Sequence, residues 1–355
     1  MNSYCILLYV ILHKGYFMSK IYNCNFLNSG LHFLSNNLRF CSAPAHDGPN
    51  ISSKHPGTKD VISSLLKIRQ HAINDMKKHI APRQCEGCIY LKEYDLDSPF
   101  LSIDDLEMQN SEPLISNIVI DHFQQCNCYC IYCFIRKETK IITSEPKRSD
   151  YYDLYPIIEY LYKEKLIDTE NLQVEFNGGD VSVLKEFPDL LDIFLKNNVK
   201  SLVISTNAIK FLPEIVEASK KTDVKLITSV DAGSRQVFKR IRILDKFDDV
   251  IENLKKYKSE CENLDMCTKY ILMEKLNDTK EEIDNFLMKS QYAGADRVQM
   301  DIDYNKFMYS SGARNYVPKH FYELFEYFKE QSELKKLNPF IWEYTQCILD
   351  KGYFE

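Results

Sequence analysis

The sequence predicts an α/β protein built on a parallel β-sheet. From about residue 115, the 355-residue chain alternates short β-type runs with amphipathic stretches, a pattern typical of repeated strand-helix units. Polar or glycine residues follow several of these runs, at the strand ends where barrels of such units place their active sites. The length exceeds that of a usual single domain, which predicts one large barrel-type domain with an appendage, or two domains.

Six strand-helix units are expected in order along the chain. The strands are expected at residues 118–121, 172–176, 201–205, 224–230, 266–273 and 297–302. The intervening helices are expected at 152–166, 183–196, 212–220, 247–259 and 279–293, with a closing helix at 316–336. These units define a core domain at residues 114–310, followed by a C-terminal helical region at 311–355.

The N-terminal third of the chain does not show this alternation of strands and helices. Residues 1–17 are interpreted as an extension, with Met18 as an alternative start of translation. Their apolar run at 5–12 is too short to span a bilayer, and it lacks both a basic flank and a cleavage site. Residues 18–113 are expected to form a separate segment, with a loop rich in Pro, Gly and Ser at 44–59.

Composition and charge narrow the classes of partner. Apolar residues make up 45% of the chain, charged residues 27%, and the net charge is −6, all ordinary for a soluble globular protein. No polybasic region is present to attract nucleic acid or an anionic membrane, so neither is expected as a partner. Because nothing directs secretion, we expect a cytoplasmic protein whose clustered cysteines serve as metal ligands or catalytic groups rather than disulfides. The scattered Cys5, Cys261, Cys267 and Cys347 are expected to be buried small apolar residues.

Three cysteines stand at close spacing directly after the first expected strand. Cys126, Cys130 and Cys133 are separated by three and then two residues, so a tight loop can bring their thiolates together. Thiolates at such spacing suit an iron–sulfur cluster or zinc. Cys128 lies between them and is either a bystander or the fourth ligand of a closed zinc site.

With the aromatic Tyr132 before the last cysteine, this motif resembles the signature of the radical S-adenosylmethionine (radical SAM) superfamily. The resemblance implies a partial (β/α)6 barrel of the radical SAM type. It also implies a 4Fe–4S cluster on Cys126, Cys130 and Cys133, with its fourth iron left open for S-adenosylmethionine.

Other strand ends are similar to stretches that line the cofactor pocket in that family. Gly178, Gly179 and Asp180 resemble a Gly-Gly-Glu motif, with Asp in place of Glu, whose backbone holds the amino group of the cofactor's methionine. The remaining residues that the resemblance assigns to the cofactor pocket are Tyr132, Ser205, Asn207, Ser229, Asp231 and Lys269. Arg240, Arg242 and Lys269 are candidates to meet the cofactor's carboxylate, and a solvated basic face is the alternative for the two arginines.

A second set of cysteines lies in the N-terminal segment. Residues 30–40 predict a hairpin that brings Cys24 and Cys41 together, and Cys85 with Cys88 completes four ligands. The set resembles the SPASM or twitch domains that hold an auxiliary cluster, although those usually follow the core. The resemblance implies a second 4Fe–4S cluster, and a structural zinc ribbon is the alternative.

The implied activity is reductive cleavage of S-adenosylmethionine to a 5'-deoxyadenosyl radical, which abstracts hydrogen from a substrate. Relatives with an auxiliary cluster often act on peptides or sugars, so the substrate is expected to be a peptide or a carbohydrate. A one-electron reductant such as flavodoxin or ferredoxin is the implied partner. The alternative is a non-catalytic iron–sulfur or zinc protein, which the pocket motifs at the strand ends argue against.

Overall fold

The computed structural model describes residues 20–35, 37–41, 51–52, 58–85, 88, 91–95, 114–133, 153–303, 317–342, 345–346 and 349. The expected extension at 1–17 lies outside these residues. The described strands are β1 Lys20–Asn23, β2 Gly30–Leu34, β3 Asn37–Arg39, β4 Ile51–Ser52, β5 Lys92–Asp95, β6 Asn117–Asp121, β7 Gln173–Phe176, β8 Ser201–Ser205, β9 Asp223–Ser229, β10 Asp265–Leu272, β11 Arg297–Ile302 and β12 Asn338–Ile341.

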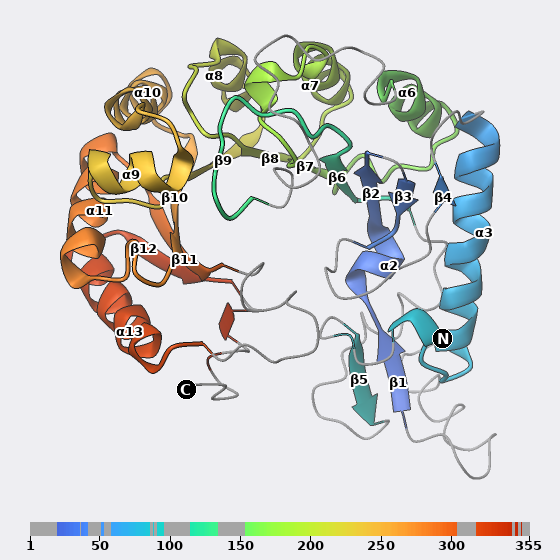
Figure 1. Cartoon of the computed structure of the whole chain (residues 1–355). Helices are drawn as coiled ribbons and strands as arrows, with labels where there is room; N and C mark the ends of the chain where they lie inside the picture. The colour runs from blue at the N-terminus through green and yellow to red at the C-terminus, as the bar shows by residue number, and fades with distance from the viewer. Residues whose placement is uncertain are drawn as a thin grey trace.

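Ten of these strands form one curved sheet in the order β12-β11-β10-β9-β8-β7-β6-β2-β3-β4. Every neighbouring pair from β12 to β2 is parallel, and β3 and β4 continue the edge antiparallel. Figure 1 shows these strands in an open arc with the helices on its outer side. The predicted α/β fold with a parallel sheet is confirmed, and the six expected strands are β6 to β11.

The described α-helices are α2 Asn25–Ser29, α3 Thr58–Lys77, α6 Tyr155–Lys163, α7 Phe187–Lys196, α8 Pro213–Ser219, α9 Arg235–Arg242, α10 Phe247–Glu260, α11 Lys280–Ala293 and α13 Lys319–Leu334. The helix expected at 183–196 starts later, because a 3-10 turn occupies Val181–Val183 and Pro188 stands in the first turn of α7. Helix α9 was not expected from the sequence, because its many basic residues hide its apolar positions.

The two faces of the sheet differ in polarity. On the outer face, beneath the helices, Val174 and Phe176 of β7 are fully buried, as are Leu202 and Ile204 of β8. The alternate positions of the same strands are only partly buried, and they include the polar residue Glu175. Parallel sheets are usually covered on both faces, so a polar, partly open concave face is suited to hold a ligand.

The N-terminal segment joins the core sheet. The predicted hairpin is confirmed, since β2 pairs antiparallel with β3, but β2 also pairs parallel with β6 along its whole length. Part of the expected auxiliary segment, residues 18–113, is thus an extension of the core sheet, while β1 and β5 form a separate two-stranded sheet. The polar-apolar pattern of residues 30–40 could not reveal the pairing of β2 with β6, because this pairing depends on two strands that are distant in sequence.

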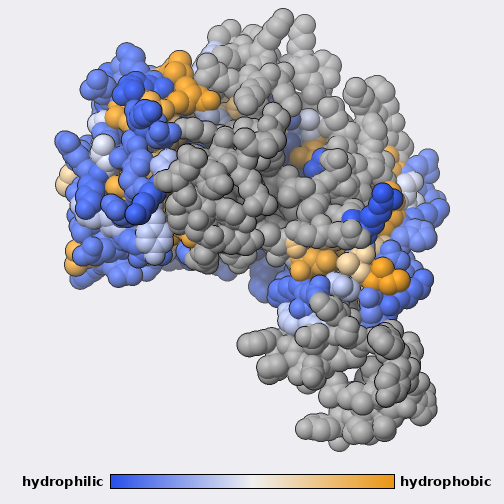
Figure 2. All heavy atoms as spheres, turned by 60° about the horizontal axis from the view of Figure 1, so that its bottom comes forward, coloured by the Kyte–Doolittle hydropathy of each residue, from blue (hydrophilic) through white to orange (hydrophobic). Residues whose placement is uncertain are grey.

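The C-terminal region combines a helix with a strand. Helix α13 lies within the range 316–336 expected for the closing helix. After it, β12 pairs parallel with β11 at the end of the sheet. In Figure 2, the side of the molecule that carries α11 and α13 is mainly hydrophilic, with smaller apolar areas. Within the described residues, no helix combines the length and the apolar character that crossing a membrane requires.

Candidate functional site

The loop with three cysteines leaves the sheet at the carboxyl end of β6 and is anchored to α9. The Tyr129 backbone N–H donates to the Arg242 carbonyl at 3.2 Å, and the Ile131 N–H donates to the Ile241 carbonyl at 2.9 Å. Both carbonyls belong to the last turn of α9, where no intrahelical partner is available. The helix that the sequence analysis missed therefore fixes the position of this loop.

The Gly178-Gly179 turn lies directly against the same loop. Its backbone bonds are Gly179 N–H to the Phe123 carbonyl at 3.0 Å and Asp180 N–H to the Gln125 carbonyl at 2.9 Å. A Cβ on Gly179 would come within 1.8 Å of the Gln125 carbonyl oxygen, and Gly178 has a left-handed φ of 89°. The two glycines thus allow the close approach of the chain's own cysteine loop, a reason different from the expected approach of a ligand.

Asp180 joins the turn after β7 to the turn after β8. Its buried carboxylate accepts hydrogen bonds from the Asn207 N–H at 2.6 Å, the Thr206 hydroxyl at 3.0 Å and the Ser182 N–H at 2.9 Å. This carboxylate holds the ends of two neighbouring strands in register with each other.

Asn207 connects those strand ends to the first cysteine. Its side-chain amide donates to the Asn127 side chain at 2.5 Å and lies 3.7 Å from the Cys126 sulfur. Ser205, on the partly exposed concave face, donates to Asn177 at 2.9 Å, and Asn177 donates to Glu175 at 2.6 Å. Of the predicted pocket residues, the structure therefore brings Asp180 and Asn207 against the cysteine loop, and Ser205 against Asn177.

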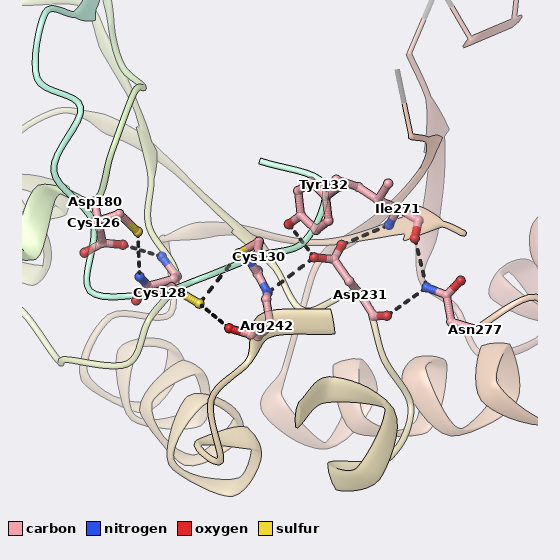
Figure 3. A network of polar contacts seen from close by, with 10 residues as sticks. Cys126, Cys128, Cys130, Tyr132, Asp180, Asp231, Arg242, Ile271 and Asn277 are labelled. Atoms are coloured by element: carbon pink, nitrogen blue, oxygen red, sulfur yellow. Dashed lines mark hydrogen bonds and ion pairs between the residues drawn. The ribbon is translucent and has the colours of Figure 1, made fainter. Parts of the chain in front are cut away.

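A buried polar network surrounds Cys130 (Figure 3). The Arg242 Nη1 donates to the Cys130 sulfur at 2.7 Å, and its Nε lies 3.4 Å from Asp231 Oδ2. The same carboxylate accepts from the Tyr132 hydroxyl at 2.6 Å and from the Ile271 N–H at 2.9 Å. Two predicted pocket residues, Tyr132 and Asp231, are therefore bonded to each other.

Two cysteines of the loop, Cys130 and Cys126, differ in the direction in which their surroundings shift the pKa of the thiol. The pKa of Cys130 is lowered to about 6. The hydrogen bond with Cys128 lowers this pKa most, burial raises it, and the charge of Arg242 lowers it as well. Burial, followed by the charge of Asp180, raises the pKa of Cys126 to about 12. Cys130 is thus a thiolate near neutral pH, while Cys126 keeps its proton until a metal displaces it.

Ser229 and Lys269 lie in register on the strands β9 and β10. The Lys269 ammonium forms an ion pair at 2.7 Å with Asp301, which also accepts hydrogen bonds from Gln299 at 2.7 Å and from Thr345 at 3.0 Å. Lys269 is therefore held on the concave face by a fully buried carboxylate.

Sequence reasoning missed a buried asparagine that supports this network. Asn277 donates to the Asp231 carbonyl at 2.9 Å and to the Ile271 carbonyl at 2.8 Å, and it is fully buried. Arg242 was a candidate for the cofactor's carboxylate, and the structure brings its guanidinium to the sulfur of Cys130. A period of apolar residues at Phe238 and Ile241 was the signal that could have assigned Arg242 to a helix.

The four N-terminal cysteines come from separate elements. Cys24 precedes α2, Cys41 follows β3, Cys85 ends a 3-10 helix, and the Cys88 N–H donates to the Cys85 carbonyl at 3.0 Å. Burial, followed by the charges of Cys24, Cys88 and Cys41, raises the pKa of Cys85 to about 12. These thiols are therefore close enough to interact electrostatically.

The cysteine side chains of the loop suit an iron–sulfur cluster better than a single metal ion. Within the described part of the chain, no three His, Cys, Asp or Glu side chains surround a position for a single metal ion. A 4Fe–4S cluster makes a different demand, because each cysteine binds a separate iron. An anchored loop with three thiols, one of them against a buried cation, fits that demand.

Comparison with known proteins agrees with this chemistry. Residues 120–287 match the family model described as the radical SAM superfamily. A Brachyspira hyodysenteriae protein named GTPase Obg is 28% identical over 188 residues, 51% of this chain and 27% of the relative. GTP 3',8-cyclase of Haemophilus influenzae is 23% identical over 164 residues, 46% of each protein. The chain thus spans less than half the length of these curated relatives.

Among solved structures, Streptococcus suis SuiB bound to the precursor peptide SuiA is similar, with a TM-score of 0.50 and 15% identity. The match covers 91% of this chain and 71% of SuiB, and at this identity it shows the shared fold alone. The superfamily implies a 4Fe–4S cluster and S-adenosylmethionine as cofactors. Residues 120–287 thus match a radical SAM domain, which together with enzymes among the relatives supports an enzyme whose specific reaction is not assigned.

Proposed function

We propose that Cys126, Cys130 and Cys133 hold a 4Fe–4S cluster and that the enzyme abstracts hydrogen from a peptide or carbohydrate substrate. The contact between Arg242 and the Cys130 sulfur carries this proposal, because a buried cation stabilises the thiolate that a cluster requires. When bound, the reduced cluster supplies one electron to S-adenosylmethionine, whose cleavage gives the 5'-deoxyadenosyl radical that removes the hydrogen atom.

The residues at the strand ends position the cofactor in this proposal. The backbone carbonyls of the turn before Asp180 accept the methionine amino group, while Asp180 keeps this turn and Asn207 together. Ser205, Ser229 and Tyr132 complete the proposed pocket with hydroxyl groups. The chain's own contribution is to orient the reacting groups and exclude water from them.

The proposed substrate site is the concave face of the sheet. Glu175 lies there beside Asn177 and Ser205, and Lys269 with Asp301 lies further along the same face. Groups of both charges can hydrogen-bond a polar substrate, which supports a peptide or a carbohydrate rather than an apolar one. SuiB, which shares the fold, is described in complex with a precursor peptide.

We propose a cytoplasmic flavodoxin or ferredoxin as the one-electron donor. Ile131 in the cysteine loop is 39% exposed and Ile243, which follows α9, is 49% exposed. Their exposure beside the loop supports electron entry from this side, where a small redox protein can approach the cluster.

For the N-terminal cysteines we propose a second 4Fe–4S cluster of the SPASM or twitch kind. The mutual effect of Cys24, Cys41, Cys85 and Cys88 on the pKa of Cys85 supports a shared site. The alternative is zinc in a structural ribbon, since four thiolates also suit that metal.

The proposed reaction is tested by the release of 5'-deoxyadenosine. Protein reconstituted without oxygen should release it when given S-adenosylmethionine and dithionite, and Cys130→Ala should abolish the release. Cys261→Ala, at the end of α10, is the matched control and should keep it. Unchanged release by Cys130→Ala would refute the assignment of the loop.

A further inference from the structure

We infer that Arg242 sets the reduction potential of the cluster by donating a hydrogen bond to the sulfur of Cys130, and that Asp231 holds Arg242 in this position. The inference rests on the proposed function, because it requires a cluster on the cysteine loop. Arg242 is a positioning residue in this role, since it acts on the cluster through a ligand.

The geometry supports a direct and persistent contact. The distance from Arg242 Nη1 to the Cys130 sulfur is 2.7 Å, and the Arg242 residue is only 5% exposed. The guanidinium lies 5.8 Å from the centre of the Tyr132 ring, over its face. Enclosed in this way, the N–H group has little water to bind in place of the sulfur, so the hydrogen bond is strong.

The balance of charge points to a thiolate partner. Arg242 is a buried cation, and the carboxylate of Asp231 lies 3.4 Å from its Nε on the side opposite to the sulfur contact. A buried cation is stabilised by anions beside it, and it in turn stabilises negative charge added next to it. A cluster that accepts an electron gains negative charge at its ligands, so the site is built for that change.

Asp231 is itself held in an unusual backbone conformation. It has a positive φ of 61°, which a non-glycine residue adopts at a cost. The Ile271 N–H bonds its carboxylate and the Asn277 amide bonds its carbonyl, so the fold maintains this conformation. Figure 3 shows the continuous chain of contacts from Asn277 through Asp231 and Arg242 to Cys130.

The expected consequence concerns the potential of the cluster. Hydrogen bonds to ligand sulfurs stabilise the reduced, more negative state and therefore raise the reduction potential. Cys128 has a weaker role, because its sulfur lies 3.6 Å from both the Cys130 sulfur and the Arg242 carbonyl. We assign the main effect to Arg242, whose hydrogen bond carries a full positive charge.

The test is a redox titration of reconstituted full-length protein, followed by the electron paramagnetic resonance of the reduced cluster without S-adenosylmethionine. Arg242→Gln should make the midpoint reduction potential of the cluster more negative by at least about 59 mV. For a one-electron couple, this shift is a tenfold change in the equilibrium between the oxidised and the reduced cluster. Arg242→Lys, which keeps the charge, should recover part of the shift. Lys239→Gln is the control, because Lys239 carries the same charge on α9 but is exposed.

The outcomes separate this inference from the proposed function. An unchanged midpoint in both Arg242 variants would overturn the inference while the cluster itself persists. A weaker affinity for S-adenosylmethionine without a shift in potential would instead assign Arg242 to the cofactor's carboxylate, and would equally overturn it. If Arg242→Gln does not retain a cluster, the midpoint of Arg242→Lys decides the question. Absence of any redox-active cluster on the loop of the unmodified protein would refute the proposed function itself.

Discussion

The two groups of cysteines in this chain differ in how the fold prepares them for a metal. On the loop after β6, the hydrogen bond with Cys128 and then the buried guanidinium of Arg242 lower the pKa of Cys130 to about 6, against the effect of burial. In the N-terminal group, burial raises the pKa of Cys24 and raises that of Cys85 to about 12. The loop thus holds one thiolate, that of Cys130, before any metal arrives, whereas a metal would have to displace the protons of Cys126 and Cys85. Cysteine spacing alone does not reveal this difference.

The largest effect is expected from Gly179→Ala. The new Cβ would come within 1.8 Å of the Gln125 carbonyl oxygen, so the cysteine loop must move. We expect loss of the cluster proposed for the loop and no change in the metal proposed for the N-terminal cysteines, measured by iron analysis and electron paramagnetic resonance. Gly294→Asn, at the end of α11, is the control, because Asn tolerates the left-handed conformation there. A normal cluster in Gly179→Ala would contradict the tight packing of this turn.

Changing both Cys85 and Cys88 to Ala tests the other group. If that group holds a second 4Fe–4S cluster, the iron content should fall by half, since only the loop cluster remains. Release of 5'-deoxyadenosine should persist, because the loop keeps its own ligands. Loss of zinc with unchanged iron would identify the N-terminal site as a zinc ribbon instead.

A smaller effect is expected from Asp180→Ala, which tests the link between the two strand ends. Its loss leaves the buried N–H of Asn207 without its 2.6 Å partner, which costs about 1–3 kcal/mol of stability. Denaturant unfolding of the apoprotein measures this cost. Asp192→Ala removes an exposed ion pair with Lys196 and should change stability much less, because solvent screens such pairs. Equal stability of the two variants would show that Asp180 does not tie these turns together.

The smallest effect is a pH dependence of apoprotein stability. Between pH 6 and 8, Cys130 is deprotonated in the folded state but would be protonated when unfolded, since its pKa falls from 9.0 to about 6. The unfolded state then binds more protons, so stability increases with pH across this window and is lost as the pH falls through 6. Cys85 contributes nothing there, because its raised pKa leaves it protonated in both states.

Chemical unfolding of the apoprotein at several pH values measures this dependence. Cys130→Ala should remove the part of the slope that lies between pH 6 and 8, while Cys85→Ala should leave it. A slope that persists in Cys130→Ala would assign the pH dependence to other groups.

Local pattern was sufficient for most of the strands and helices in the core. The apolar alternation at 201–205 and 297–302 predicted β8 and β11 with the bounds that the structure has. The cysteine spacing and the Gly-Gly-Asp turn likewise predicted a site at the strand ends. Such signals lie within a few residues of each other, so they are visible without knowledge of distant contacts.

Other features needed the tertiary structure. The sequence alone determined a parallel α/β core with a cysteine loop after its first predicted strand, because hydrophobic periodicity and ligand spacing are local properties. Only the folded chain decided that β2 extends the core sheet and that Gly179 packs against Gln125. It also brought Arg242 to Cys130, across 112 positions of sequence, since burial of a charge beside a sulfur depends on elements that meet only on folding.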